Sequence, residues 1–535
     1  MTPTPPDPDA LADALARTGR TYDAVPYTSI PFPRLQPARL AANARLLGLD
    51  APDPSRARTL EIGCASGGHI VPLAAAFPQA RFVGVDISAG QVASGRERID
   101  ALGLRNVELH ACSVTEIGAD WGDFDYVICH GVYSWVPDAV RENILRVCAE
   151  RLSPDGIAAI SFNVLPGWRM FQVVRDSMIL HAGAEADHQT RSLRSRQLFD
   201  LMAQHSPEAS SYGSIWRKEA RRMVEQPDAY LAHEIFEDHN APCTFRSFAD
   251  AAARRGLAYL SETRLRENVP ESGQAERAEV IRSLAAGDRT ATEQYIDILT
   301  GRTFRESLLV RAGREAGLSR GLDPERLAGL HLIAPLDLRA DPPPRPGEFV
   351  LADDDGMVAT TQDHAVAAAL DLLLKRQPAS TAVDDLVARA ETEAERDRIL
   401  AALLRLVLDG ALDVSAEPVR CASRPGDTPT VWPLLAQDIM RGADRSATLR
   451  HATVSIDPMM RFLAPLLDGR HDAAGIADAL MRLAQEGLVS ISDETGAIAE
   501  PDRLAAACRA QIDRRIAALA RMGALLEDQP PPGRD

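Results

Sequence analysis

Lysine and cysteine are both scarce in this chain of 535 residues. Only Lys218 and Lys375 are lysines, whereas arginine and alanine are abundant, and a GC-rich coding bias is the simplest explanation. The seven cysteines are scattered, without a C-x-x-C pair or a cluster of cysteine and histidine. This spacing argues against a structural zinc site and against a disulfide framework, so we expect no metal.

Long apolar runs are missing as well, although 45% of the residues are hydrophobic. No stretch is long enough to span a bilayer, and the N-terminus carries no charged and then apolar leader. We therefore expect a soluble protein that stays in the cytoplasm, without membrane insertion. Acidic residues outnumber basic ones, and the formal net charge is −17. That balance disfavours nucleic-acid binding and favours cationic partners, such as peptides that carry lysine or arginine.

The length predicts several domains, since ~100–200 residues usually form one. From residue 51 to 180 short apolar strands alternate with helices, which is typical of an α/β parallel sheet of Rossmann-like type. In front of it, residues 1–50 form an N-terminal cover. Residues 1–20 give little structural signal, and the alternation of prolines and aromatic residues in Tyr22–Pro37 predicts an extended segment. The expected strands are Thr59–Ile62, Arg81–Asp86, Val107–Cys112, Phe124–Cys129 and Ile157–Phe162.

Beyond Trp168 helical periodicity dominates, and we expect a helical regulatory and dimerisation domain over residues 181–320. The proline-rich segment Ala340–Gly347 is the clearest linker. Two later stretches look alike, because in each of them short helices lead to a Gly-Ala-Leu sequence, at Gly410–Leu412 and at Gly523–Leu525. This degenerate repeat predicts two modules of winged-helix type, residues 321–425 and 426–535.

The stretch Thr59–Gly68 carries the strongest chemical signal. A short strand runs into a glycine-rich turn, with Glu61 two residues before Gly63, and Asp86 ends the next strand, where Rossmann-like units hold ribose hydroxyls. Glycine at positions 63 and 67 is expected because the backbone must bend sharply and pass close to a ligand, which leaves no room for a Cβ atom. The turn lacks the middle glycine of G-x-G-x-x-G, and Glu61 would repel a pyrophosphate but suits a methionine ammonium. The pattern predicts S-adenosyl-L-methionine as cofactor rather than a dinucleotide.

A second cluster, His130–Trp135, follows the fourth expected strand. Ligands of doubly wound sheets bind beyond the carboxyl ends of the strands, so His130, Tyr133 and Trp135 should face the reacting methyl group. Aromatic faces attract a sulfonium or an ammonium, which fits transfer to an amine. Two other interpretations remain open: the aromatic pair can be core, and His130 can be a hydrogen-bonded turn residue. We therefore assign no general base.

Four segments carry a family resemblance; they are Tyr22–Pro33, Leu60–Gly68, His130–Pro137 and Asn163–Trp168. Together they resemble the bacterial protein-lysine methyltransferases that modify outer-membrane proteins, and the wider group of class I methyltransferases with a methyltransferase regulatory domain. His233-Glu234 and Tyr295–Phe304 resemble parts of that regulatory domain. The resemblance implies S-adenosyl-L-methionine as cofactor, a helical region that forms a homodimer, and lysine side chains of a protein, such as an outer-membrane protein, as acceptors.

By position, the resemblance also implies a cofactor site and an acceptor channel. Ser113 departs from the pattern, because many methyltransferases place an acid there, near the adenine. The acceptor lysine, with an ordinary pKa near ~10.4, would lose its proton in an apolar channel, and its amine would displace the methyl group directly. Tyr133, Trp135 and Trp168 are the expected catalytic residues of that channel, with Tyr27 as a lid. The expected cofactor-binding residues are Glu61, Gly63, Ala65, Gly67, Asp86, Ile87, Ser113, Val114 and His130.

Two other functions remain open. The same sheet could methylate a small metabolite, or the winged-helix-like modules could bind DNA while the cofactor fold acts as a sensor. The acidic balance and the lack of a dense basic recognition helix disfavour DNA binding, and Arg514–Arg521 is the segment to test. In an acidic chain we expect such modules to contact protein instead.

Overall fold

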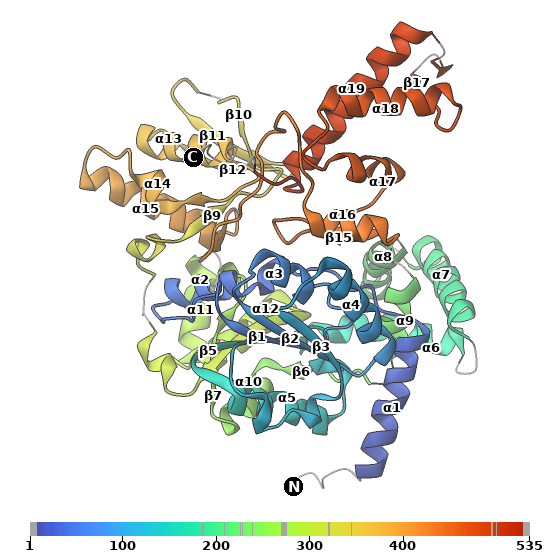
Figure 1. Ribbon diagram of the computed structural model, residues 1–535. Helices are drawn as coiled ribbons and strands as arrows, with labels where there is room; N and C mark the ends of the chain where they lie inside the picture. Colours follow the sequence, from blue (N-terminus) through green and yellow to red (C-terminus); the bar gives the residue numbers. More distant parts are fainter. Residues whose placement is uncertain are drawn as a thin grey trace.

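The computed structural model describes residues 8–183, 187–207, 209–224, 226, 228–237, 239–268, 275–318, 322–343, 345–493, 496–498 and 500–527. Figure 1 shows an α/β domain with two further modules on one side of it. The expected α/β fold class, with a Rossmann-like sheet, is confirmed.

The central sheet is formed by β1 (Arg58–Ile62), β2 (Arg81–Asp86), β3 (Val107–Ala111), β4 (Phe124–Cys129), β5 (Leu152–Leu165), β6 (Cys243–Thr244), β7 (Leu257–Glu262) and β8 (Phe304–Arg311). The strand order is β3-β2-β1-β4-β5-β8-β7, and β6 pairs with the end of β5. The strands β1–β5 are parallel, whereas β8 runs antiparallel between β5 and β7. The order reverses between β1 and β4, so the carboxyl ends of these strands form the place where such sheets bind ligands.

Helices cover both faces of this sheet. The parallel strands are mostly buried, which suits runs rich in valine, isoleucine and leucine. The helix after β2 is capped at its N-terminus by Ser88, whose hydroxyl accepts a hydrogen bond from the Gln91 N–H, and at its C-terminus by Gly103 in the left-handed conformation. The covering helices are α2 (Pro37–Leu46), α3 (Ile70–Ala76), α4 (Ala89–Leu102), α5 (Asp138–Arg151), α10 (Phe245–Arg254) and α12 (Arg289–Thr300), and α11 (Ala275–Ala285) packs on α12.

The N-terminal helix α1 (Pro8–Ala24) lies against α4. For residues 8–20 it corrects the expectation of little structure, whereas residues 1–7 lie outside the described residues. It also places Tyr22 in a helix and not in an extended segment. After Pro8 the next proline is Pro26, so no missing N–H interrupts the helix before Ala24. From Val25 to Phe32 the chain is not helical.

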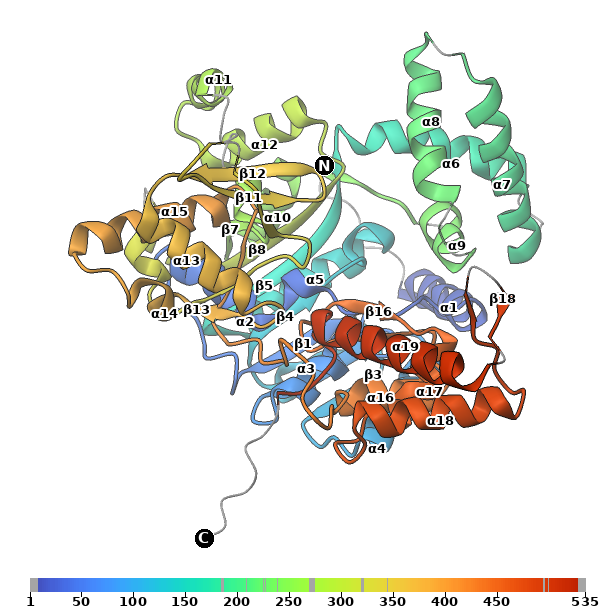
Figure 2. The ribbon, with the colours of Figure 1, turned by 90° about the horizontal axis from the view of Figure 1, so that it is seen from above.

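A helical insertion lies between β5 and β6 and forms the lobe around α6–α9 at the upper right of Figure 2. It consists of α6 (Trp168–Ala182), α7 (His188–His205), α8 (Ser211–Val224) and α9 (Asp228–Phe236), around a core that includes Trp168, Phe199 and Trp216. The prediction of a helical domain over residues 181–320 is wrong from β6 onward, because β7 and β8 return to the sheet. Arg305, Glu306 and Ser307 make β8 polar, which hides it from a search for apolar strands.

The first module after the sheet domain contains α13 (His364–Lys375), α14 (Val383–Val387) and α15 (Glu393–Leu408). Its strand β9 (His331–Ile333) lies between β13 (Thr381–Ala382) and β14 (Asp413–Ser415). A second small sheet consists of β10 (Arg339–Asp341), β11 (Phe349–Asp353) and β12 (Gly356–Thr361). Ala340 and Asp341 pair with β11, so the segment expected as a linker begins inside this module.

The second module consists of α16 (Pro433–Met440), β15 (Arg445–Ala447), β16 (Thr453–Ser455), α17 (Pro458–Leu463), α18 (Ala473–Gln485), β17 (Ser492–Asp493), β18 (Gly496–Ala497) and α19 (Pro501–Arg521). In it Thr430 bridges to Asp468 and Val431 bridges to Leu525. The first module has the same plan, since β9 pairs with β13 after its first helix and with β14 after its last.

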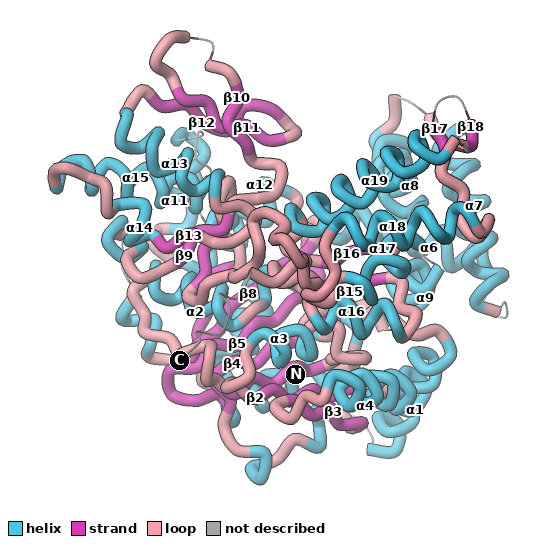
Figure 3. The backbone as a smooth tube through the Cα atoms, turned by 45° about the horizontal axis from the view of Figure 1, so that its top comes forward, coloured by secondary structure: helices cyan, strands magenta, loops and turns pink. Residues whose placement is uncertain are grey.

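Both modules share hydrophobic cores with the sheet domain, and Figure 3 shows α16 beside α4. Leu40 of α2 belongs to one cluster with Leu370 of the first module, and Cys64 of the glycine turn belongs to another with Leu434 of the second. A two-point ion pair between Arg98 of α4 and Asp438 of α16, at 2.8 and 2.6 Å, adds to the second contact. The second module is therefore packed directly against the predicted cofactor turn.

Candidate active site

The predicted glycine turn connects β1 to α3. Gly63 and Gly67 have φ angles of 77° and 76°, in the left-handed region that favours glycine. A Cβ at Gly63 would lie 2.3 Å from Cγ2 of Val132, so the turn also passes close to the chain that follows β4. The N–H of Ala65 donates to Oδ2 of Asp86 at 2.8 Å. This hydrogen bond fixes the turn to the end of β2.

Glu61 lies in β1 between Gly84 of β2 and Ile128 of β4, and it is only 4% exposed. Burial, and then the charge of Asp86, raise the pKa of its carboxyl well above the usual value. Among the described residues Oε2 of Glu61 has no hydrogen-bond partner. A buried carboxylate oxygen costs free energy unless a donor reaches it. The methionine ammonium of S-adenosyl-L-methionine would be such a donor, so the residues present fit this cofactor.

Asp86 and Ile87 stand at the end of β2, and α1 packs beside them. Oδ1 of Asp86 accepts from the Ser88 N–H at 2.9 Å, and burial raises the pKa of this carboxyl. Asp23 of α1 accepts from the hydroxyl of Ser88 at 2.6 Å and from the N–H of Gly90 at 3.1 Å. An acid therefore lies where ribose hydroxyls are expected, with α1 held next to it.

Ser113 and Val114 follow β3. The N–H of Ser113 donates to Oε1 of Glu116 at 2.7 Å, and its hydroxyl accepts from Thr115, so Ser113 caps its own short turn. Val114 is buried among side chains on one side of the sheet. The position that carries an acid in many methyltransferases therefore offers an apolar surface and a hydroxyl.

We call residues 25–32 the N-terminal strap, because they cross the glycine turn. The hydroxyl of Ser29 accepts from the N–H of Gly68 at 2.7 Å, and a Cβ at Gly68 would lie 2.2 Å from the carbonyl carbon of Ser29. Further along, the N–H of Phe32 donates to Nδ1 of His69 at 3.2 Å. Only glycine at position 68 leaves room for the strap to pass this close.

His130 follows β4 and lies among aromatic rings and one acid. The ring of Phe32 from the strap is 4.1 Å away between centroids, and that of Phe304 is 5.8 Å away. Nδ1 of His130 lies 3.7 Å from Oε1 of Glu306. Burial lowers the pKa of His130, although Glu306 acts in the opposite direction. His130 is thus a neutral ring that joins the strap to β8.

Trp135 and Trp168 meet edge to face, with ring centroids 6.2 Å apart. The indole N–H of Trp168 donates to Oδ1 of Asn240 at 3.0 Å, and both tryptophans pack in the core of the helical insertion. The structure therefore brings these two predicted residues together, at the junction between the β4 end and the insertion.

Tyr133, the third residue expected in the acceptor channel, does not join them. It is 4% exposed, and its ring lies 5.4 Å from that of Phe248 and 6.2 Å from that of Phe162, inside the core. Tyr133 and Trp135 lie in one 3₁₀ turn, in which residues two apart point to different sides. The turn therefore sends Tyr133 into the core and Trp135 toward the insertion.

The sequence argument missed a cluster of buried polar side chains on the insertion. His233 and Glu237 lie one helical turn apart at the end of α9, and they are 5% and 4% exposed. The ring of Tyr22 stacks on His233 at 4.3 Å, and that of Tyr27 lies 5.8 Å from it. The segments Tyr22–Pro33 and His233-Glu234 both carried the family resemblance, but neither the resemblance nor the spacing of four between His233 and Glu237 shows that these parts, more than 200 residues apart, meet.

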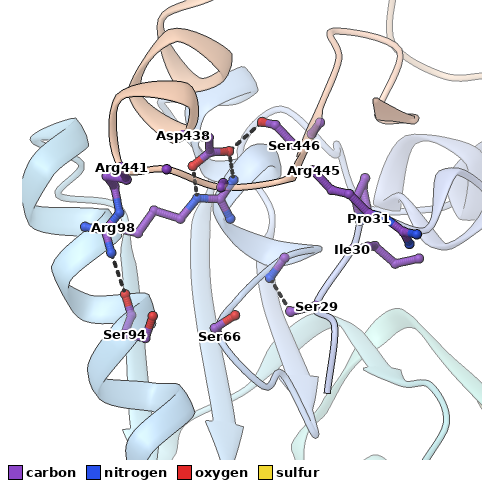
Figure 4. A pocket seen from close by; sticks show the side chains of 14 residues that line it. Ser29, Ile30, Pro31, Ser66, Ser94, Arg98, Asp438, Arg441, Arg445 and Ser446 are labelled. Atoms are coloured by element: carbon purple, nitrogen blue, oxygen red, sulfur yellow. Dashed lines mark hydrogen bonds and ion pairs between the residues drawn. The ribbon is translucent and has the colours of Figure 1, made fainter. Parts of the chain in front are cut away.

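A cavity of about 290 Å³ lies between the sheet domain and the second module, and the strap borders it (Figure 4). Ser29 and Pro31 of the strap, Arg98 of α4, and Arg441 and Arg445 of the second module border it. The carboxylate of Asp438 is bound by Arg98 and by the hydroxyl of Ser446 at 2.5 Å. The cavity is thus an interdomain space next to the glycine turn.

Within the described residues, no helix has the length and apolar character needed to cross a bilayer. The same part of the chain contains no group of three or more histidine, cysteine, aspartate or glutamate side chains that could hold a metal ion. All seven cysteines are unpaired.

Three family models match the chain. A methyltransferase domain matches residues 59–156, a predicted methyltransferase regulatory domain matches residues 227–311, and the C-terminal winged helix domain of PKMT matches residues 427–524. Together with the sheet order and the glycine turn, these matches define a class I methyltransferase, and they confirm S-adenosyl-L-methionine as its cofactor. The regulatory-domain match includes β7 and β8, so this region completes the catalytic sheet.

The uncharacterized protein RP789 of Rickettsia prowazekii is 30% identical to this chain over 497 residues, 88% of each protein. The chain belongs to the same family as RP789. The structure of PKMT2 from Rickettsia typhi superimposes with a TM-score of 0.81 at 23% identity, over 94% of this chain and 100% of that one, and its complex with AdoHcy gives 0.82. Trans-aconitate 2-methyltransferase of Deinococcus radiodurans is 31% identical over 120 residues, 22% of this chain and 43% of that enzyme.

Proposed function

We propose that this methyltransferase acts on proteins and transfers methyl groups to lysine side chains. The observation that carries the proposal is the C-terminal module, which matches the PKMT winged helix domain and shares a hydrophobic core with the glycine turn. The net charge of −17 supports a cationic acceptor. Outer-membrane proteins are the acceptors that the family resemblance suggests.

In this proposal the cofactor lies across the carboxyl ends of β1 and β2. Oε2 of Glu61 binds the methionine ammonium and Asp86 binds the ribose, because Glu61 is a buried carboxylate near the end of β1 and Asp86 is a half-buried carboxylate at the end of β2. The glycines of the turn let the backbone approach the ligand closely. In the same proposal Ala65, Ile87, Ser113, Val114 and His130 contact the cofactor from the turn and from the segments after β2, β3 and β4.

The protein contributes alignment and exclusion of water to a direct displacement. When bound, the cofactor supplies a methyl carbon, to which the acceptor nitrogen bonds while sulfur keeps the electron pair of the broken C–S bond. The strap covers the turn through Ser29 and Phe32, which limits water at the reacting atoms. Trp168 holds Trp135 at the β4 end, where an aromatic face attracts the charged groups of both substrates.

The helical insertion is our candidate for a homodimer interface. Leu180 of α6 is 85% exposed, and Leu193 and Leu201 of α7 are 59% and 53% exposed. Several large apolar side chains at the surface of one lobe favour a covered face. Light scattering after gel filtration should give twice the chain mass, and replacing Leu193 and Leu201 together by serine should give the monomer. A monomeric wild type would contradict this assignment.

Incubation of bacterial extracts with the protein and methyl-labelled S-adenosyl-L-methionine tests the acceptor class. Label in acid-precipitated protein, followed by mass spectrometry of methylated lysines, supports the proposal. Label only in the organic extract would support a small-molecule acceptor, the alternative suggested by the partial match to trans-aconitate 2-methyltransferase. The Glu61→Gln variant serves as the control with impaired cofactor binding.

A further inference from the structure

His233 and Glu237 leave two buried acceptor atoms facing each other. Nε2 of His233 lies 2.7 Å from the carbonyl oxygen of Val25, which can only accept, so Nε2 carries the hydrogen. In the neutral ring Nδ1 then has a free lone pair. It lies 3.9 Å from Oε2 of Glu237, and neither atom has a hydrogen-bond partner among the described residues. A hydrogen-bond donor placed between these two buried atoms would satisfy both of them.

Aromatic rings border the same place. The ring of Tyr22 is stacked on His233, with the two planes 11° apart, and the tilted ring of Tyr27 completes the border. Tyr27 is 36% exposed while His233 and Glu237 are buried, so the cluster is reached from the side of Tyr27. Faces of tyrosine rings attract cations. The missing donor is therefore best supplied by a positively charged group.

This cluster adjoins the cofactor site. Asp23, the residue after Tyr22 in α1, accepts hydrogen bonds from the hydroxyl of Ser88 and from the N–H of Gly90, directly after β2. Asp86 binds the glycine turn, and the strap that begins at Val25 continues to Ser29 above that turn. Tyr22 thus connects the end of β2 to α9.

We propose that Glu237 and Nδ1 of His233 receive the amino group of the acceptor, between the rings of Tyr22 and Tyr27. This inference rests on the proposed function, whose acceptor is an amine. An amino group carries N–H donors, which can supply the hydrogen bonds that Nδ1 of His233 and Oε2 of Glu237 do not have. A carboxylate acceptor would instead be repelled by Glu237. Nδ1 of His233 accepts the proton that the ammonium must lose, and the neutral amine then forms the N–C bond as the C–S bond breaks. Positive charge moves from sulfur to nitrogen in that step, so the carboxylate of Glu237 beside the nitrogen stabilises the transition state.

Sinefungin tests this assignment without knowledge of the acceptor protein, because it carries an amine-bearing carbon in place of the methylsulfonium of the cofactor. Calorimetry should show that the wild-type protein binds sinefungin at least about tenfold more tightly than AdoHcy. In Glu237→Gln this preference should disappear, while the Kd of AdoHcy stays within twofold. A wild type without the preference, or a variant that keeps it, would overturn the proposal, as would an equal loss of both ligands.

Two further variants complete the test. Glu219→Gln is the matched control, because Glu219 lies in the same insertion but is paired with Arg222, and it should keep the preference for sinefungin. Tyr27→Leu should reduce the preference about fivefold by removing an aromatic face; an unchanged preference would count against the ring's role. The labelling experiment tests the proposed function separately from this site. If the wild type prefers sinefungin but no protein becomes labelled, the protein acceptor is refuted, whereas the amine site is still supported.

Discussion

The imidazole of His69 accepts a hydrogen bond from that of His451, 382 residues away, with Nδ1 and Nε2 2.8 Å apart. The N–H of Phe32 donates to the same Nδ1 at 3.2 Å, so this nitrogen accepts and the hydrogen between the rings belongs to His451. His69 follows the glycine turn, Phe32 belongs to the strap, and His451 belongs to the C-terminal module. Three distant parts of the chain therefore meet at one neutral ring.

This junction predicts an acid-sensitive fold. Burial and the neighbouring histidine His130 lower the pKa of His69 from 6.5 to about 3, and burial and His69 lower that of His451 well below 6.5. The unfolded chain therefore binds more protons below pH 6.5. The free energy of unfolding should fall as the pH drops from about 6.5 toward 3, by up to about 1.4 kcal/mol per pH unit for each histidine. Urea unfolding at several pH values measures this slope.

The variant His451→Gln separates these histidines from other titrating groups. Its amide can still donate to His69, but it does not titrate in this range. The slope between pH 5 and 6.5 should therefore decrease by up to about 1.4 kcal/mol per pH unit relative to the wild type. An unchanged slope would show that His451 is already protonated in the folded protein.

Gly68→Ala should displace the strap. The new Cβ would lie 2.2 and 2.4 Å from the carbonyl carbon and oxygen of Ser29, which are backbone atoms that cannot move alone. We expect about tenfold weaker cofactor binding and faster tryptic cleavage at Arg20 and Arg34, because an overpacked contact costs ~1–3 kcal/mol. Gly19→Ala is the control, since its Cβ would meet the Ile87 oxygen at an ordinary 3.4 Å. Equal cleavage of both variants would contradict the close passage of the strap.

The parts of the site that follow from sequence are local. Glu61, Gly63 and Gly67 belong to one strand and turn, and Asp86 ends the next strand, so spacing along the chain places them. The extended strap also follows from its prolines. The parallel strands β1–β5 were predictable because burial on both faces requires continuous apolar runs.

The rest depends on contacts that spacing cannot show. His233 meets Val25 across 208 residues, and only the packing of α9 beside α1 brings Tyr22 onto its ring. The strand β8 escaped prediction because Arg305, which is fully buried, is neutralised by Glu262, Glu293 and Asp297. An ion network of this kind makes a buried strand polar in sequence.

Glu61→Gln should change stability and cofactor binding in opposite directions. The pKa of Glu61 is raised in the fold, so the wild type loses stability as the pH rises above its unfolded value near 4.5. Without cofactor, the variant should be more stable by about 1 kcal/mol at pH 8, with no gain below pH 4.5. It should bind S-adenosyl-L-methionine at least about tenfold more weakly, because the ammonium loses its charged partner.

Thermal melting with and without cofactor measures both effects in one experiment. The wild type should melt lower than the variant when alone and higher when saturated. If the variant is less stable in both states, Glu61 supports the fold and does not bind the ammonium.

Variants of Tyr133 and of Trp135 should distinguish a role in core packing from a role in catalysis. Tyr133→Phe keeps the ring against Phe248, so both stability and kcat should stay within twofold of the wild type. Tyr133→Ala leaves a cavity in the core and should cost ~3–5 kcal/mol of unfolding free energy. Trp135 lies at the junction with the insertion, and Trp135→Ala should lower kcat at least about tenfold while AdoHcy still binds. A tenfold loss of kcat in Tyr133→Phe, with unchanged melting, would mean that its hydroxyl reaches the reacting groups and that the buried position observed here opens during turnover.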